Sequence, residues 1–232
     1  MNNVTKLPAS VDRDSIVEVT FEIRFAGTQK AVDSLLLGLL FAAFKEEFPT
    51  TEALPASQIP AMLRMSQPIL ARQATQALVG DHKRLLVGDT VVALSHIAPY
   101  PGWSKLQPLI LRLAETLQRS GVIERVERFS LKYMNVFQHG SDDLDLSPFK
   151  IKCELDGFKL RGPGFSLRSE IAQGPCVSVV ELQTGVTVTI STQEISKSYA
   201  GTRLSVDTIW QAGFTDFWNE LPHMLGVAHD TA

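Results

Sequence analysis

The chain has 232 residues, and its 22 Lys and Arg against 25 Asp and Glu give a net charge of −3 at pH 7. Apolar residues make up 44 % of the sequence, which is enough for a hydrophobic core and excludes a disordered or fibrous protein. The even, slightly acidic charge balance argues against a broad basic surface, so we expect neither nucleic acid nor a membrane as the partner.

The first half of the chain has the hydrophobic patterning of an alternating strand and helix protein. Residues 16–25 alternate strictly between apolar and polar side chains, which predicts a strand with one buried face. A wide apolar stripe in the following segment predicts a largely buried helix. In chain order we expect a strand at 16–25, a helix at 30–46, strands at 68–79 and 84–96, a helix at 104–119 and a strand at 123–137.

The connections between these elements carry their own signals. Residues 49–68 contain four prolines and predict a long connection with one helical turn near 58–64. Residues 80–83 read as a hairpin loop, and Gly88-Asp89 reads as a bulge inside the strand at 84–96. Ser104 is a candidate N-cap for the second helix. The order strand, helix, strand, strand, helix, strand predicts a split βαβ, or ferredoxin-like, topology.

The second half is predicted to be rich in strands. Gly174-Pro175 and Thr184-Gly185 indicate tight turns between them. We expect strands near 149–155, 165–171, 176–182, 186–191 and 203–211, followed by an amphipathic helix at 214–227. The predicted fold class is therefore α+β, with a ferredoxin-like first half followed by a β-meander that a C-terminal helix closes.

A polar, acidic segment at 138–148 predicts a boundary between the two halves. The expected division is a flexible N-terminus at 1–15, a βαββαβ half at 16–140 and a β-rich half at 146–232. The two halves could also share one sheet.

Several segments occur in an order and at a spacing that resemble a known family. They are the strand Val19–Phe25, the element Pro99-Tyr-Pro-Gly-Trp103, the strand Val126–Phe137, and the pair Leu225 and His229 near the C-terminus. Together they resemble a sporadically distributed bacterial family of uncharacterised proteins, with an EIRF-like first strand, a Tyr-x-x-Trp element and an RYIN-like strand. The family has no assigned activity, so the resemblance implies a fold but no function.

The motifs that usually carry chemistry are missing from the sequence. There is no phosphate-binding loop and no dinucleotide-binding glycine pattern, and none of the five histidines forms a metal-binding pair. We therefore predict no catalytic, cofactor-binding or metal-binding residue, and expect a protein that is not an enzyme. The longest apolar run has ten residues, at Leu35–Phe44, and the N-terminus has no apolar signal region. We expect a cytoplasmic protein with Cys153 and Cys176 reduced.

The candidate interaction surface combines a loop and a strand face. Tyr100 and Trp103 are large amphipathic residues on a rigid loop, which suits an interaction hot spot, although both could simply pack on the core. Glu22, Arg24 and Lys132 lie on the polar faces of two predicted strands. Cross-strand ion pairs of Glu18 and Glu22 with Arg24, and with Arg128 or Lys132, would account for these charges structurally.

The leading functional hypothesis is a non-catalytic protein that binds another protein or regulates it. A sensor that binds a small ligand in a cleft between the two halves is one alternative. Another is an enzyme with a site of scattered residues, for which Glu22, Arg24, Lys132 and Tyr133 are the candidates. Self-association into a homodimer, through an edge strand or the aromatic C-terminal region, is a further hypothesis.

Overall fold

The computed structural model describes residues 15–27, 32–138, 154–155, 158–159, 164–191, 196–211 and 213–232. The strands are β1 (Ile16–Gly27), β2 (Thr50–Ala53), β3 (Ala74–Gly80), β4 (Lys83–Gly88), β5 (Val91–Ile97), β6 (Ile123–Phe137), β7 (Glu154–Leu155), β8 (Phe158–Lys159), β9 (Ser166–Gln173), β10 (Cys176–Ser191) and β11 (Ser196–Gln211). The helices are α1 (Val32–Phe44), α2 (Ala61–Ser66), α3 (Pro68–Ala71), α4 (Trp103–Ser120) and α5 (Phe217–Thr231), with a 3₁₀ turn at Pro55–Gln58.

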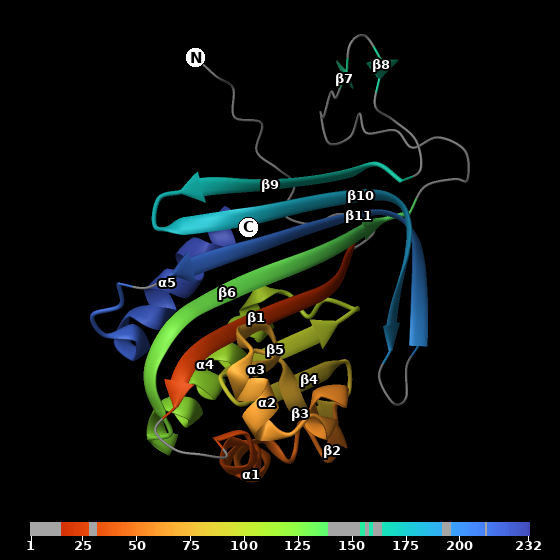
Figure 1. Cartoon of the computed structure of the whole chain (residues 1–232). Helices are drawn as coiled ribbons and strands as arrows, with labels where there is room; N and C mark the ends of the chain where they lie inside the picture. The colour runs from red at the N-terminus through yellow and green to blue at the C-terminus, as the bar shows by residue number, and fades with distance from the viewer. Residues whose placement is uncertain are drawn as a thin grey trace.

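One large antiparallel sheet organises the protein (Figure 1). Its nine strands lie in the order β2-β3-β4-β5-β1-β6-β11-β10-β9. Strands β9, β10 and β11 form the meander that the sequence predicts, and β11 pairs with β6 along ten residue pairs from Thr202↔Phe137 to Gln211↔Arg128. The segments predicted as two halves therefore contribute to a single continuous sheet.

Strand alternation gives this sheet one apolar and one polar face. In β1, Val19, Phe21 and Ile23 are almost completely buried, while Glu22 and Arg24 point to the other side. Helices α1, α4 and α5 cover the apolar face: α1 packs on β3 and β4, α4 on β6, and α5 on β6 and β11. Figure 1 shows these helices on one side of the curved sheet. The predicted one-sided strand at 16–25 is confirmed.

The two longer helices follow the predicted apolar spacing. The buried residues of α4 are Leu106, Ile110, Leu113, Ala114 and Leu117, and those of α5 are Phe217, Leu221, Met224, Leu225 and Ala228. Gly121 ends α4 in the left-handed conformation, as expected for a helix C-terminus. The prediction of Ser104 as N-cap is wrong, because α4 begins at Trp103 and Gly102 occupies the capping position.

The α+β class is confirmed, but a ferredoxin-like first half is not. Residues 84–96 form two strands, β4 and β5, because the chain reverses at Gly88-Asp89 where we expected a bulge. A Cβ atom on Gly88 would lie 2.4 Å from the backbone oxygen of Gln73, so only glycine allows this approach. The extra reversal makes β5 antiparallel to β1, whereas a split βαβ unit needs a parallel neighbour.

Two further segments differ from the prediction. The expected strand at 68–79 begins instead as the short helix α3, and β3 starts only at Ala74. The predicted turn at Thr184-Gly185 is a bulge within the continuous strand β10, where Gly185 has a φ of +64° and the register with β11 shifts between Gln183 and Val186. A bulge bends its strand, and Figure 1 shows the distal part of the β10–β11 hairpin turned away from the rest.

The predicted domain boundaries fall among residues that the structure does not describe. Residues 1–14 and 139–153 lie outside the described ranges, and so does most of the strand expected at 149–155. The division into two domains therefore stays a prediction.

Helix α1 is apolar on all sides, and its expected deep burial is wrong for half of its surface. Leu36, Leu40 and Phe44 are at most 1 % exposed. Leu35 and Leu39, on the opposite side, are 42 % and 39 % exposed. The sheet and α4 therefore cover only one side of this helix.

A buried arginine fastens α2 to the sheet and to α1. Arg64 is 5 % exposed and binds both carboxylate oxygens of Asp89, at 2.7 and 3.1 Å. Its guanidinium also donates to the backbone oxygen of Ile59 at 2.6 Å and lies 3.5 Å from Asp33 at the start of α1. Hydrogen bonding to Asp89 raises the pKa of Arg64, so the group stays charged.

Replacement of this cation should strongly destabilise the fold. Arg64→Met leaves the carboxylates of Asp33 and Asp89 without their shared partner, and we expect the free energy of unfolding to fall by about 3–5 kcal/mol in urea denaturation. Arg119→Met is the matched control, because it removes an exposed i,i+4 pair with Glu115 and should cost less than about 1 kcal/mol. Equal losses in the two variants would contradict the anchoring role of Arg64.

Candidate functional site

The structure places the predicted interaction residues on opposite sides of the sheet. Glu22, Arg24 and Lys132 lie on the polar face, on neighbouring strands β1 and β6. Tyr100 and Trp103 are partly buried and pack against the hydrophobic core. The five residues therefore do not form one continuous surface.

The charges on the central strands are paired, as predicted for Arg24 and Arg128. Glu22 accepts a hydrogen bond from Arg24 at 2.7 Å and lies 3.5 Å from the guanidinium of Arg128. Arg128 also lies 3.9 Å from Asp207 on β11. Burial, and secondarily the nearby Arg24, lowers the pKa of Arg128. Lys132 has no carboxylate within 4 Å in the described part of the chain, so its predicted pairing is not found there.

A second group of ion pairs continues across β11, β10 and β9. Glu181 lies 3.4 Å from Arg203 and 3.7 Å from Arg168, and Arg168 binds Glu170 at 2.7 Å. Positive and negative side chains thus alternate along this face. Exposed pairs of this kind add little stability, but they define which charges the face offers to a partner.

An aromatic cluster brings together residues that carry the family resemblance. The ring of Trp103 stacks on His229 with a centroid distance of 4.1 Å and an interplanar angle of 9°. The Tyr133 hydroxyl and Nδ1 of His229 form a hydrogen bond at 2.9 Å, and Tyr100 meets Tyr133 edge to face at 6.0 Å. The Tyr-x-x-Trp element, the RYIN-like strand and the C-terminal helix therefore meet at this cluster.

The electrostatics of the cluster favour neutral side chains. Burial raises the pKa of Tyr133, and its hydrogen bond with Tyr100 raises it further. Burial lowers the pKa of His229, and the charge of Asp230 opposes this only in part. Tyr133 also faces the helices, away from Glu22, Arg24 and Lys132, so the four residues considered for an enzyme site do not converge.

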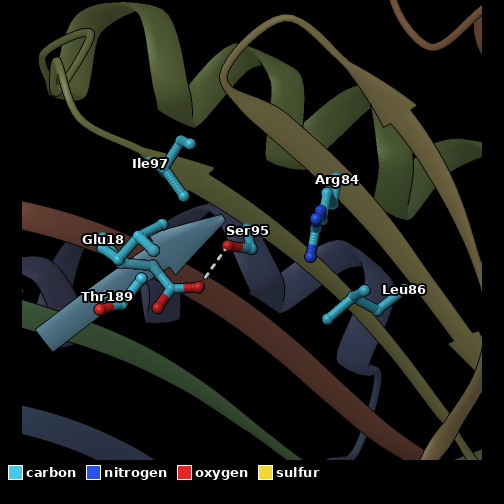
Figure 2. Close-up of a pocket in the computed structure, with 7 residues that line it drawn as sticks. Glu18, Arg84, Leu86, Ser95, Ile97 and Thr189 are labelled. Carbon is cyan, nitrogen blue, oxygen red and sulfur yellow. Dashed lines mark hydrogen bonds between the residues drawn. The ribbon is translucent and has the colours of Figure 1, made fainter. Parts of the chain in front are cut away.

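A pocket of about 240 Å³ lies between the polar face and the bent part of β10. It is lined by Glu18, Arg84, Leu86, Ser95, Ile97, Thr189 and Ile190. Figure 2 shows Glu18 near the end of β10 and pointing toward Ser95. The Glu18 carboxylate accepts a hydrogen bond from the Ser95 hydroxyl at 2.5 Å. Sequence reasoning missed this pocket because it depends on the bulge at Gly185, which reads as a turn.

The most exposed apolar side chains gather on three consecutive helices. Eight large hydrophobic residues are exposed in the described part of the chain, and seven of them lie on α1, α2 and α3. We call them the α1–α3 surface: Leu35, Leu39, Phe41, Met62, Leu63, Met65 and Ile69. The only charged residue of α2 is the buried Arg64, α3 has none, and α1 contributes only Asp33. The surface is therefore apolar and almost without charge.

Three findings concern metal binding, membrane-spanning helices and relatedness to known proteins. Within the described residues, no group of three or more His, Cys, Asp or Glu is placed to hold a metal ion. Over the same residues, no helix combines the length and apolarity needed to cross a bilayer. The chain matches no known protein-family model and no curated protein sequence, so the family resemblance stays a prediction.

The neutral state of His229 predicts a loss of stability in mild acid. The unfolded chain binds a proton at this residue below about pH 6.5, whereas the folded chain does so only at lower pH. The melting temperature should therefore fall as the pH drops below about 6.5, and His229→Phe should reduce that fall. His96, whose pKa burial also lowers, should account for part of the remaining slope. An NMR titration that gives His229 a pKa of 6.5 or above would contradict this expectation.

Proposed function

We propose that this chain is a non-catalytic protein that binds another protein through the α1–α3 surface. The observation that supports it is the uncovered half of α1. A helix that is apolar on all sides is normally buried on all sides, because each exposed apolar side chain forfeits the free energy of its transfer from water. In the isolated chain Leu35 and Leu39 remain in contact with solvent.

Helices α2 and α3 carry the other exposed apolar side chains of this set. Met62 is 86 % exposed and Ile69 is 79 % exposed, which is unusual for residues on a fixed helix. Arg64 holds α2 in place, so these side chains are presented on an anchored element. Methionines adapt to different partner shapes, and an uncharged apolar surface best fits the apolar stripe of a helix from another protein.

A charge-insertion experiment tests this proposal. The chain is recovered from its native cells by affinity capture with quantitative mass spectrometry, beside the variant Met62→Glu/Ile69→Glu. We expect a stoichiometric partner whose recovery falls at least roughly tenfold in the variant, because carboxylates at the centre of an apolar contact cannot be solvated.

The matched control places the same number of charges on another helix. Ser104→Glu/Gln118→Glu alters two exposed residues of α4 and should retain the partner. Absence of any stoichiometric partner, or equal recovery by both variants, would reject the α1–α3 surface as the binding site. The cytoplasmic location expected from the sequence stays a prediction.

The pocket beneath β10 supports a second candidate function, the binding of a small ligand. Glu18 presents a carboxylate and Arg84 a guanidinium to the same cavity, and Leu86, Ile97 and Ile190 add apolar walls. A ligand complementary to these groups carries an ammonium, a carboxylate and a small apolar body. An α-amino acid has this chemistry and fits a volume of about 240 Å³.

Thermal unfolding in the presence of each common amino acid tests the second candidate. A ligand that binds only the folded chain should raise the melting temperature by a degree or more at saturating concentration. Glu18→Gln and Arg84→Met should each abolish that shift. Glu181→Gln, on the same face but outside the pocket, should preserve it. If no amino acid raises the melting temperature, the proposal of an α-amino acid ligand is rejected.

A further inference from the structure

Strand β9 ends the sheet at the edge opposite β2. No strand of the described residues pairs with its outer side. Every residue of β9 except Leu167 is exposed, and Ile171 is 43 % exposed. An eight-residue edge strand that is paired on one side only is a template for another strand.

The hairpin turn determines which backbone groups face outward. Gln173 and Cys176 flank the two-residue turn Gly174-Pro175, where Gly174 has a φ of +59°. In a two-residue hairpin the flanking residues exchange both backbone hydrogen bonds, so Gln173 and every second residue before it bond to β10. The outward groups therefore belong to Ser166, Arg168, Glu170 and Ala172.

We infer that β9 pairs with β9 of a second copy of this chain, antiparallel and centred on Ser169. Two copies can align their outward groups in only a few registers. The register centred on Ser169 places Arg168 opposite Glu170 of the other copy, twice by symmetry. Shifting the centre to Arg168 or to Glu170 places like charges directly opposite, which is unfavourable. The sequence of β9 is thus complementary to itself in one register.

The same register accounts for the apolar side chains of β9. Leu167 and Ile171 lie on the face opposite Arg168 and Glu170, because successive residues alternate. In the dimer each Ile171 lies opposite Leu167 of the other copy. Ile171 is the one large exposed hydrophobic residue outside the α1–α3 surface among the described residues, and in the dimer it gains an apolar neighbour. The proposal does not depend on binding at the α1–α3 surface.

Sedimentation analysis of the full chain tests the proposal. At protein concentrations raised to about 100 µM, the wild-type chain should sediment with twice the 25.6 kDa mass of one chain. This high concentration is needed because a small interface binds weakly. Ala172→Pro removes an outward N–H without touching a bond to β10, so it should yield a folded monomer. Circular dichroism confirms that each variant is folded. A wild-type monomer, or a dimer that survives Ala172→Pro, would overturn the proposal.

A charge swap tests the register. The variants are made with Glu181→Gln, because Glu181 lies opposite Arg168 on β10 and would repel an acid there. Glu181→Gln alone should remain dimeric. Adding Arg168→Glu should raise the dissociation constant roughly tenfold or more, since two attractive cross-strand pairs become repulsive. The swap Arg168→Glu/Glu170→Arg should restore the dimer, and a folded swap that stays monomeric would overturn the Ser169-centred pairing.

Discussion

The pairing of β1 between β5 and β6 is the constraint on which the rest of the structure depends. Its strict alternation commits one face of the sheet centre to Val19, Phe21 and Ile23, and the other to polar side chains. A slip of one residue in either register would exchange the two faces. The apolar face must be covered by helices, and the polar face must balance its charges. These two requirements determine where the helices pack and how the charged side chains are paired.

The helical layer is narrower than the sheet. Nine strands spaced by about 4.8 Å make a sheet about 38 Å wide, whereas three packed helices span only about 30 Å. Helices α1, α4 and α5 pack on strands between β3 and β11, and none of these three helices packs extensively on β9 in the described part of the chain. The layer also ends at α1, where Leu35 and Leu39 remain exposed. Both proposed protein contacts lie where this layer stops.

The sequence predicted the elements whose signal is local. The alternation of β1, the apolar spacing of α4 and the turn at Gly174-Pro175 each depend on neighbouring residues, and all three predictions are confirmed. The predictions at Gly88 and Gly185 are wrong, because the local structure at these glycines depends on backbone that is distant in the sequence. After Gly88 the chain reverses and β5 pairs back on β4, whereas Gly185 makes a bulge because β11 continues alongside.

The candidate sites show the same limit. The ion pairs of Glu22 with Arg24 and Arg128 follow from strand alternation and could be predicted. Glu18 and Ser95 meet through the pairing of β1 with β5, and Thr189 joins them in the pocket because β10 bends. The exposure of Leu35 could not be predicted either, since an apolar helix carries no signal for which of its sides remains uncovered. Tyr100 and Trp103 looked available for binding, yet Tyr133 and His229 occupy their contact surfaces.

The two proposed contacts differ in chemistry, and this difference gives them different roles. Pairing along β9 uses directional hydrogen bonds and fixed charges, so it selects one partner, a second copy, in one register. The α1–α3 surface is apolar and rich in methionine, so it tolerates variation in the helix that it binds. Because α1 packs on β3 and β4, near the opposite end of the sheet from β9, a β9 dimer would carry its two α1–α3 surfaces at its far ends. Each dimer could then bind two partner chains at once. A partner that is itself a dimer would bind more tightly overall, because its two contacts with the α1–α3 surfaces would be linked.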